Sequence, residues 1–396
     1  MPGRFANKAG GQGECAVPEG VDSFDFVVIG AGMAGASVAA GLAARARVLL
    51  LEMEPQPGYH TTGRSAAVFA PIYGPQPIRA LTRASEAFYR DPPEGFTDHP
   101  LFSPRSILMA AREDQLGALE ALMAELGSDG PVARLDAGET REAMPLLREG
   151  YAAGAVHDPT GQDIDVHALH QGYLRQVRAR GGRIETGAEA VRLTRNGGTW
   201  EIATSDAAFQ AGTVVNAAGA WADAVGALAG AERIGLVPKR RTALMVPAPE
   251  GRVLEGLPIT VDIEEQFYLK PDAGRLLISP ANEDPEAPCD VQPDEMDIAI
   301  CIDRIERAFD LSVRRIETKW AGLRSFVADK CPVAGLSDRA EGFYWLAGQG
   351  GYGIQTAPAL SEFAAAELLG DAVPGHILAE RFDPATVRPG REGIGG

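Results

Sequence analysis

The sequence is poor in cysteine and has no long hydrophobic run. Its four cysteines lie far apart, without the spacing of a zinc site or of a disulfide framework, at Cys15, Cys289, Cys301 and Cys331. A reducing compartment, the cytoplasm, is therefore the simplest expectation. No stretch approaches the roughly 18 apolar residues of a membrane-spanning helix. The glycine-rich residues 1–21 lack the apolar core of a signal peptide, and we expect a mobile extension there.

Positive charge is also scarce. The chain has 37 Lys and Arg residues against 54 Asp and Glu residues, which gives a formal net charge of −17. This balance disfavours nucleic acid and anionic membranes as partners, because both need a basic surface. It still allows a local basic pocket for a small anion. With 396 residues, 45% hydrophobic and 23% charged, the composition is that of a globular enzyme of about two domains.

Residues 24–52 carry the clearest motif. A β-branched run predicts a buried strand, and Gly30, Gly32 and Gly35 follow it directly in the order G-x-G-x-x-G. Small residues then predict a helix packed closely on a sheet, and a second strand ends at Glu52. In this arrangement the glycines let a pyrophosphate approach the helix N-terminus, while the acid binds a ribose hydroxyl. The stretch therefore predicts a dinucleotide-binding unit.

Later segments can lie beside the same dinucleotide. Residues 55–67 form a loop that we expect to open into a small-residue helix, whose free amides can receive an anion. Residues 213–217 predict an apolar strand that runs into the small-residue crossover 218–221, so the nucleotide-binding part is discontinuous. The glycine-rich turn 348–356 leads into an apolar helix, 357–369, and its glycines would let a ring system approach closely.

The rest of the pattern alternates between short strands and helices. We expect amphipathic or apolar helices at 114–126, 166–179 and 296–309. Strands are expected at 106–111, 184–186, 190–195, 200–204, 209–210, 266–270 and 275–278. The strands after residue 232 suggest a sheet that forms the wall of a pocket.

One polar cluster looks superficially like a metal site. It contains Asp163, Asp165, His167 and His170. Asp165 is placed to cap the predicted helix 166–179, and capping with solvent exposure explains the cluster equally well. We therefore expect no metal.

Taken together, the longer strings resemble the D-amino-acid oxidase family of FAD enzymes, and within it the bacterial D-arginine dehydrogenases. The strings that carry this resemblance are 26–35, 57–67, 167–175, 215–219, 238–241, 267–274, 321–324 and 348–356. They occur in the family's order and span nearly everything from about Asp22 to Leu369.

The resemblance implies an α/β fold of two domains, with a discontinuous Rossmann-like FAD-binding domain and an antiparallel-sheet substrate domain. The implied FAD-binding domain comprises residues 22–92, 159–231 and 319–384. The implied substrate domain comprises 93–158 and 232–318, and we expect a mobile tail at 385–396. A monomer or weak oligomer is expected.

The implied cofactor is FAD, bound non-covalently; His60 is the alternative, as a covalent attachment point. Residues implied to contact the cofactor come from all the glycine-rich and small-residue strings. They are Gly30, Gly32, Met33, Ala34, Gly35, Glu52, Met53, Thr62, Gly63, Arg64, Ser65, Ala66, Ala67, Val191, Ala217, Gly219, Trp221, Arg324, Gly350, Gly351, Tyr352, Gly353, Ile354, Gln355 and Thr356.

The resemblance also implies a substrate site. Arg241 and Arg324 match positions that clamp the substrate carboxylate, and two guanidinium groups can each bind an anion in a fork. Tyr268 matches a tyrosine that adds a bond to the carboxylate, and Tyr73 matches a residue beside the flavin and substrate. The remaining implied contacts with substrate are Gly351, Gln355, Val68, Ala70, Ile107, Ile259, Val261 and Ile354.

Three of these positions depart from the D-arginine enzymes. The acid that binds the substrate guanidinium there is Ile107 here, and a histidine and a threonine are replaced by Val68 and Ala70. A guanidinium buried beside Ile107 would lose its charge partner. The sequence therefore predicts a substrate with a neutral or apolar side chain.

The expected reaction is oxidation of a D-amino acid to its imino acid by hydride transfer to flavin, followed by hydrolysis to a 2-oxo acid and ammonia. The amine must be neutral; no protein base stands out, although Tyr73 or a water could help. The electron acceptor is oxygen or a quinone-like molecule. Glycine, an N-alkyl amino acid or a 2-hydroxy acid remain alternative substrates, and a flavin-binding protein without turnover is the alternative of another class.

Overall fold

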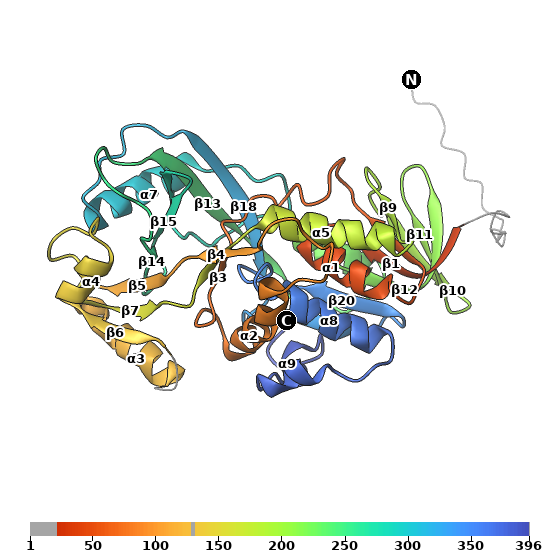
Figure 1. Ribbon diagram of the computed structural model, residues 1–396. Coiled ribbons are helices and arrows are strands. Elements are labelled where there is room, and N and C mark those ends of the chain that lie inside the picture. Colours follow the sequence, from red (N-terminus) through yellow and green to blue (C-terminus); the bar gives the residue numbers. More distant parts are fainter. Residues whose placement is uncertain (1–21, 128–130, 396) are drawn as a thin grey trace, which may run out of the picture.

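The computed structural model describes residues 22–127 and 131–395 of the chain. The expected N-terminal extension, 1–21, and Cys15 lie outside the described residues. Two large β-sheets lie side by side, with helices packed against both (Figure 1). The α/β class expected from the sequence is confirmed.

The first sheet has a parallel centre, as a dinucleotide-binding motif requires. Its strands are β1 (Asp22–Ile29), β2 (Val48–Leu51), β9 (Arg183–Glu185), β10 (Arg192–Asn196), β11 (Thr199–Ala203), β12 (Ala208–Asn216), β19 (Val333–Leu336) and β20 (Phe343–Ala347). The order is β10-β11-β12-β1-β2-β9, with β20 beside the end of β12 and β19 beside β20. Neighbours among β9, β2, β1, β12 and β20 are parallel, whereas β10, β11 and β19 pair antiparallel.

Both faces of this sheet are buried, which explains the continuous apolar run in β1. Val28 faces a core formed with α1 (Met33–Leu42), α5 (Val166–Ala179) and α8 (Ala357–Leu368). Val27 faces the opposite core, which contains residues of α6 (Ala222–Leu228). The small residues of α1 allow close packing, since a Cβ on Gly41 would lie 3.0 Å from the Cβ of Ala365 on α8.

Two sequence predictions in this half are wrong. The strands expected at 209–210 and 213–217 are one strand, because β12 runs without a break from Ala208 to Asn216 and pairs with β1 on both sides of Gly212. The helix expected to open from residues 55–67 is absent: the chain turns at 61–64 and then extends into β3 (Val68–Phe69). The backbone of β3 pairs with β8 (Gln162–Ile164), with Val68 opposite Asp163.

The second sheet is mainly antiparallel. Its strands are β5 (Ile107–Ala111), β6 (Ala133–Asp136), β7 (Gly154–Asp158), β13 (Val237–Pro247), β14 (Ile259–Asp262), β15 (Tyr268–Asp272), β16 (Arg275–Ser279), β17 (Asp284–Pro285) and β18 (Thr318–Phe326). Their order is β17-β13-β16-β15-β14-β5-β7-β6, and β18 adds to β13. The β14–β5 pair is parallel and joins two distant parts of the chain in one sheet.

Helices cover this second sheet at its outer side (Figure 1). They are α3 (Leu116–Leu126), α4 (Ala137–Ala143) and α7 (Glu295–Ala308), with a short 3-10 turn, η1 (Glu113–Gln115), before α3. The apolar face predicted for α3 packs on the core, with Leu119 fully buried and Leu116, Leu122, Met123 and Leu126 partly buried. The hairpin of β15 and β16 is confirmed, with Leu269 opposite Ile278.

A small sheet and α2 (Gln76–Arg90) lie where the two large sheets meet. The small sheet has the order β3-β8-β4, with β4 at Phe102–Pro104. Asp163 on β8 accepts hydrogen bonds from Arg105 at 2.9 Å and from Lys270 on β15 at 3.0 Å. This largely buried triad ties the small sheet to the second large sheet.

Two segments bear on the expected domain boundaries. β18, which the expected boundaries place with the cofactor domain, pairs with β13 from Val237↔Phe326 to Met245↔Thr318. The expected mobile tail follows α9 (Gly375–Ala379) and contains most of η3 (Pro384–Val387). In it Val387 is buried, and Arg391 donates to both carboxylate oxygens of Asp329. Among the described helices, none combines the length and hydrophobicity needed to cross a membrane.

Candidate active site

Three adjoining cavities run from the first sheet to the second. The first lies at the β1–α1 turn and η2 (Gly219–Trp221), the second lies under the turn 348–353, and the third lies between β3 and the second sheet. The first and second share Gly32, Thr62 and Gly219 among their lining residues. The second and third share both arginines, Arg241 and Arg324. The series forms an elongated site that spans both large sheets.

The first cavity is shaped by glycines at the β1–α1 turn. Gly30 has φ +100°, and a Cβ there would lie 2.5 Å from the Ala217 carbonyl oxygen. A Cβ on Gly35 would lie 1.8 Å from the Gly30 carbonyl oxygen, so the helix can pack on the strand only with glycine present. Gly32 caps α1 without a side chain over the helix amides, and Thr62 accepts a hydrogen bond from the Met33 amide at 3.0 Å. This helix N-terminus fits a phosphate.

Glu52 lines the first cavity beside the same turn, directly after β2. Its carboxylate accepts hydrogen bonds from the backbone amides of Ala31 at 2.9 Å and Glu54 at 3.0 Å. Burial raises the pKa of Glu52, while these two hydrogen bonds act in the opposite direction. A carboxylate with two oxygens retains acceptor capacity after these bonds, as binding of a ribose hydroxyl requires.

His60 also lines the first cavity. Its Nε2 lies 2.9 Å from Glu54 Oε1, and its ring centroid lies 4.7 Å from that of Trp221. Two residues of the cluster considered as a metal site make other contacts. Asp165 caps α5, and His170 binds the Ala31 carbonyl at 2.8 Å. Over residues 22–127 and 131–395, no three His, Cys, Asp or Glu side chains are grouped to hold a metal.

The second cavity is bounded by glycines and by Arg64. Gly350 has φ +55°, and a Cβ there would lie 2.1 Å from the Phe326 ring. Arg64 extends along the wall and donates to the carbonyls of Val291 at 3.1 Å and Ala321 at 3.0 Å, and to the Asp290 carboxylate. Its guanidinium therefore fastens the 61–65 loop to the second sheet.

The third cavity combines a polar end with an apolar wall. The polar end contains Arg241, Arg324, Tyr73, Tyr268, Glu265 and Gln355, with the Gly351 backbone. The predicted pocket residues Val68, Ala70, Ile107, Ile259, Val261 and Ile354 all line its wall, together with Ile72 and Met109. The structure thus brings together every side chain that the resemblance assigned to substrate.

The two arginines come from adjacent strands. Arg241 on β13 pairs with Gly322, and Arg324 lies two residues further along β18, so both side chains project from one face. Burial lowers the pKa of Arg241, and the charge of Arg324 lowers it further. For Arg324 burial also disfavours the charge, but Tyr268, Tyr73 and Glu265 outweigh this and its pKa is raised. Both groups stay cationic, which makes this end of the cavity an anion site.

Gln355 links the cavity to β3. Its Oε1 accepts a hydrogen bond from the Ala70 amide at 3.0 Å. Its Nε2 is buried and has no hydrogen-bond partner in the described part of the chain. A buried donor without a partner is costly, so this amide is suited to a ligand atom in the cavity.

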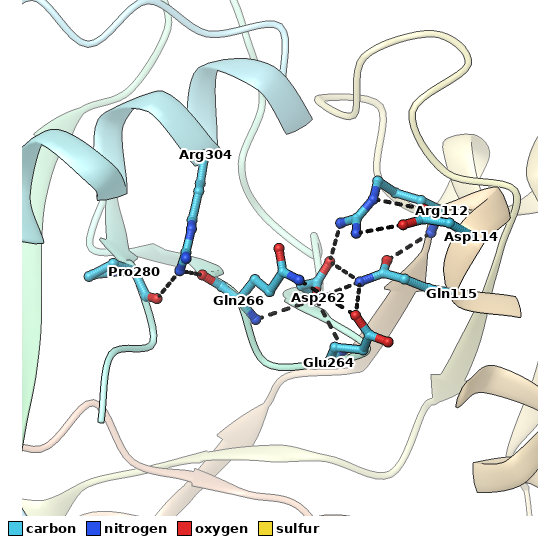
Figure 2. A network of polar contacts seen from close by, with 8 residues as sticks. All are labelled: Arg112, Asp114, Gln115, Asp262, Glu264, Gln266, Pro280 and Arg304. Carbon is cyan, nitrogen blue, oxygen red and sulfur yellow. Dashed lines mark hydrogen bonds and ion pairs between the residues drawn. The ribbon is translucent and has the colours of Figure 1, made fainter. Parts of the chain in front are cut away.

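Sequence reasoning missed Glu265, which lies in the turn between β14 and β15. Its Oε2 accepts a hydrogen bond from the Tyr73 hydroxyl at 2.7 Å, and its backbone is left-handed with φ +57°. Figure 2 shows the polar network that holds this turn, centred on the buried Asp262. The available signal was the run of polar residues 264–266, in a connection between two strands.

A few residues implied to touch the cofactor do not line these cavities. They are Gly35, Gly63, Tyr352, Thr356 and Val191. Gly35, Tyr352 and Thr356 are buried behind the lining, and Tyr352 packs edge-on against Tyr73 with centroids 5.2 Å apart, whereas Gly63 is exposed. Val191 is 50% exposed, whereas its neighbours Ala188 and Ala190 line the first cavity.

Comparison with known proteins agrees with this geometry. The family model described as DAO, FAD dependent oxidoreductase, matches residues 25–367. An uncharacterized oxidoreductase of Bacillus subtilis, YurR, is 25% identical, and the match covers 91% of this chain and 98% of that protein. Human mitochondrial dimethylglycine dehydrogenase is 26% identical over 70% of this chain, but the match spans only 33% of that longer protein.

Among solved structures, glycine oxidase from Geobacillus kaustophilus has the same fold. Its TM-score is 0.81 at 22% sequence identity, and the match covers 94% of this chain and 99% of that one.

The three cavities fit FAD. The glycine turn and α1 N-terminus suit the pyrophosphate, Glu52 suits a ribose, and Gly350 and Gly351 leave backbone open to a flat ring. The family model covers most of the chain and both sheets that build these cavities. The chain therefore belongs to the DAO family of FAD-dependent oxidoreductases.

Proposed function

We propose that this enzyme oxidises a D-amino acid with a neutral, apolar side chain to its imino acid. The observation that supports this most strongly is the third cavity, in which an arginine pair adjoins an aliphatic wall. A carboxylate suits Arg241 and Arg324, and a hydrocarbon side chain suits Val68, Ile107 and Val261. The imino acid then hydrolyses to a 2-oxo acid and ammonia.

The protein's part in this reaction is to bind and orient the amino acid. Arg241 and Arg324 hold the carboxylate, and Tyr268 adds a hydrogen bond, so that the Cα–H bond has one fixed direction. FAD, when bound, supplies the chemistry by accepting the hydrogen and electron pair of that bond. The buried aliphatic wall excludes water and places the side chain away from the arginines.

The wall also carries the proposed side-chain preference. Ile107 is 4% exposed, and its strand neighbour Ile259 on β14 faces the same cavity. A cationic side chain directed at Ile107, Ile259 and Val261 would find no counter-charge on that wall, because Glu265 lies at the polar end and is bonded to Tyr73; burial against the wall is unfavourable by several kcal/mol. Leucine, methionine and phenylalanine side chains would instead bury apolar surface.

A second candidate is oxidation of glycine or an N-alkyl amino acid. Two of the similar proteins are named a dimethylglycine dehydrogenase and a glycine oxidase. The arginine pair would bind the carboxylates of those substrates equally well. In this case the aliphatic wall would contact an N-alkyl group or remain unfilled.

Anaerobic bleaching of the flavin separates these candidates. The holoenzyme would be mixed with D- and L-leucine, D-methionine, D-phenylalanine, D-arginine, glycine, sarcosine and a 2-hydroxy acid. We expect rapid bleaching by the apolar D-amino acids and slow bleaching by D-arginine. Faster bleaching by D-arginine would refute the side-chain preference, and bleaching by sarcosine or glycine alone would favour the second candidate.

A flavin that stays yellow with every compound would indicate a non-catalytic flavoprotein. Where a compound does reduce the flavin, reoxidation by oxygen or by a quinone would identify the acceptor class.

A further inference from the structure

The third cavity contains a carboxylate, Glu265, that the proposed binding of the amino acid does not use. Within the described residues, Glu265 is the one acidic side chain that lines this cavity. It does not contact a lysine or arginine in an ion pair there, but accepts the Tyr73 hydroxyl at 2.7 Å. A tyrosine oxygen that donates its hydrogen can still accept one from a ligand. The pair is therefore open to a proton donor on the cavity side.

The turn is built to keep Glu265 in this place. Its backbone is left-handed, a conformation that side-chain-bearing residues rarely adopt and that glycine would adopt without strain. The Asp262 carboxylate accepts from the amides of Glu264 at 3.0 Å and Gln266 at 3.3 Å, and Gln115 and Arg112 bind the same carboxylate (Figure 2). The unfavourable conformation is thus held from several elements.

A second clamp fixes the far side of the same turn. Arg304 on α7 donates to the carbonyls of Gln266 at 2.6 Å and Pro280 at 2.8 Å (Figure 2). The turn therefore connects α7, η1 and β14, while its Glu265 side chain alone reaches the cavity. Such an arrangement is expected for a side chain that has a chemical task.

We propose that Glu265 accepts, through the Tyr73 hydroxyl, the proton that the substrate amine loses before oxidation. This inference rests on the proposed amino-acid oxidation. An N–H bond of the ammonium breaks, its proton bonds to the Tyr73 oxygen, and the tyrosine proton passes to Glu265 Oε2. The electron pair stays on nitrogen, and no group is oxidised or reduced in this step. The amine is then neutral, as loss of the Cα–H electron pair requires.

The charges around the pair act on both ends of the transfer, because the arginines disfavour an ammonium and also attract the Glu265 carboxylate. Arg241, Arg324, Tyr268 and Tyr352 face it from β13, β18, β15 and the turn before α8. The arginines repel an ammonium, so a bound amine is driven to release its proton. Burial, together with the Glu265 charge, raises the pKa of Tyr73, so the phenol passes a proton on rather than staying ionised. Glu265 is partly exposed and can release the proton to water.

The pH dependence of flavin reduction tests this proton relay, which runs from the substrate amine through the Tyr73 hydroxyl to Glu265. Glu265→Gln keeps an oxygen that accepts the Tyr73 hydroxyl but cannot take a proton, and Tyr73→Phe removes the link. We expect each variant to reduce the flavin about 100-fold more slowly with D-leucine at about pH 7, and nearly as fast as the wild type at about pH 10. There the amine is already neutral in solution. The double variant should be no slower than either single one.

Glu264→Gln is the matched control. It removes a carboxylate from the same turn, but the Glu264 side chain binds Gln115 and does not line the cavity. It should keep the wild-type pH profile. Three outcomes would each refute the relay. They are a rate of flavin reduction in Glu265→Gln that is lowered equally at about pH 7 and about pH 10, a pH profile in Glu265→Gln like that of the wild type, and rate losses that add in the double variant.

A binding measurement keeps the relay testable if no compound in the panel bleaches the flavin, the result that would refute the proposed function. The probes are 2-aminoisobutyrate, which has no Cα–H, and pivalate, which replaces its amine by a methyl group. In Glu265→Gln the Kd of 2-aminoisobutyrate should rise about tenfold per pH unit as pH falls from about 9, because one proton must leave to solvent. Pivalate should bind both proteins alike. Equal pH dependence in both proteins, or no binding of 2-aminoisobutyrate to the wild type, would contradict the relay.

Discussion

At the scale of single residues, this site depends on side chains held close to backbone. Arg324 is partly buried at the cavity wall, and the absence of a side chain on Gly351 makes room for its guanidinium. A similar contact occurs at the other end of the site, where the Thr62 hydroxyl accepts from the Met33 amide and would lie 3.2 Å from a Cβ on Gly32. Small changes at the glycines are therefore expected to act on binding rather than on the chemistry of FAD.

Gly351→Ala should weaken substrate binding. The new Cβ would lie 2.7 Å from Arg324 Nη1 and 3.1 Å from its Cζ, so the guanidinium must move. Loss of one charge-assisted hydrogen bond costs about 1.5–3 kcal/mol, which corresponds to a roughly 10- to 150-fold rise in KM for the amino acid. Steady-state kinetics and flavin content would be measured. Gly117→Ala on α3, where nothing lies within 4 Å, is the control, and equal KM values in both variants would contradict this account.

Ile107→Glu should move the preference toward D-arginine. The carboxylate would supply the counter-charge that the aliphatic wall lacks, so the ratio of kcat/KM for D-arginine to that for D-leucine should rise at least about tenfold. Ile107→Gln, which has the same shape without the charge, separates polarity from charge and should change the ratio little. Equal ratios in the two variants would show that Ile107 does not face the substrate side chain.

At the scale of elements, the local sequence pattern predicted the helices, strands and hairpins that are built from consecutive residues. The 24–52 unit, α3, α7, α8 and the β15–β16 hairpin were predicted because each has its own periodicity or glycine signal. The parallel β5–β14 pair was not predicted, because it joins residues about 150 positions apart. Residues 63–67 have helix-like composition, yet their first amides bond within a turn, and the chain then pairs with β8 at Val68 and Phe69.

The site likewise contains contacts between distant segments that the local sequence pattern did not predict. Arg241 and Arg324 were found through matching strings, but Glu265 and the Gln355–Ala70 bond arise from packing between elements. Nothing in the sequence around Glu265 indicates that its turn is left-handed or that Asp262, Gln115 and Arg304 hold it. A prediction from local pattern cannot supply such contacts.

The contact of α5 with the glycine turn predicts a pH effect on stability. His170 on α5 binds the Ala31 carbonyl, and burial lowers its pKa. The unfolded chain therefore binds more protons than the folded one below the unfolded pKa of about 6.5, so this contribution to the free energy of unfolding falls as pH drops through that value. His170→Gln keeps a donor but cannot titrate. Urea unfolding between about pH 7 and 5 should show a smaller loss in this variant than in the wild type; an equal loss would exclude His170.

At the scale of the whole molecule, the cofactor site spans the two large sheets. The first cavity belongs to the first sheet and the third mainly to the second, while the second cavity is lined by both. The Asp163 triad and Arg64 add polar ties across the same region. A molecule that fills all three cavities must therefore stabilise both halves together.

FAD should accordingly raise the unfolding temperature and make unfolding more cooperative. A ligand at 100 times its Kd adds about 2.7 kcal/mol, which for a chain of this length corresponds to roughly 3 °C in Tm. Calorimetry of apoprotein titrated with FAD should show this rise with concentration, and two overlapping transitions should merge into one. Glu52→Gln, which removes the charge expected to bind the ribose and changes the acceptor for the Ala31 and Glu54 amides, should shift the rise to higher FAD concentration without abolishing it. A Tm that does not depend on FAD would mean that the halves are joined by their own contacts, and that the cavities contribute little to holding the molecule together.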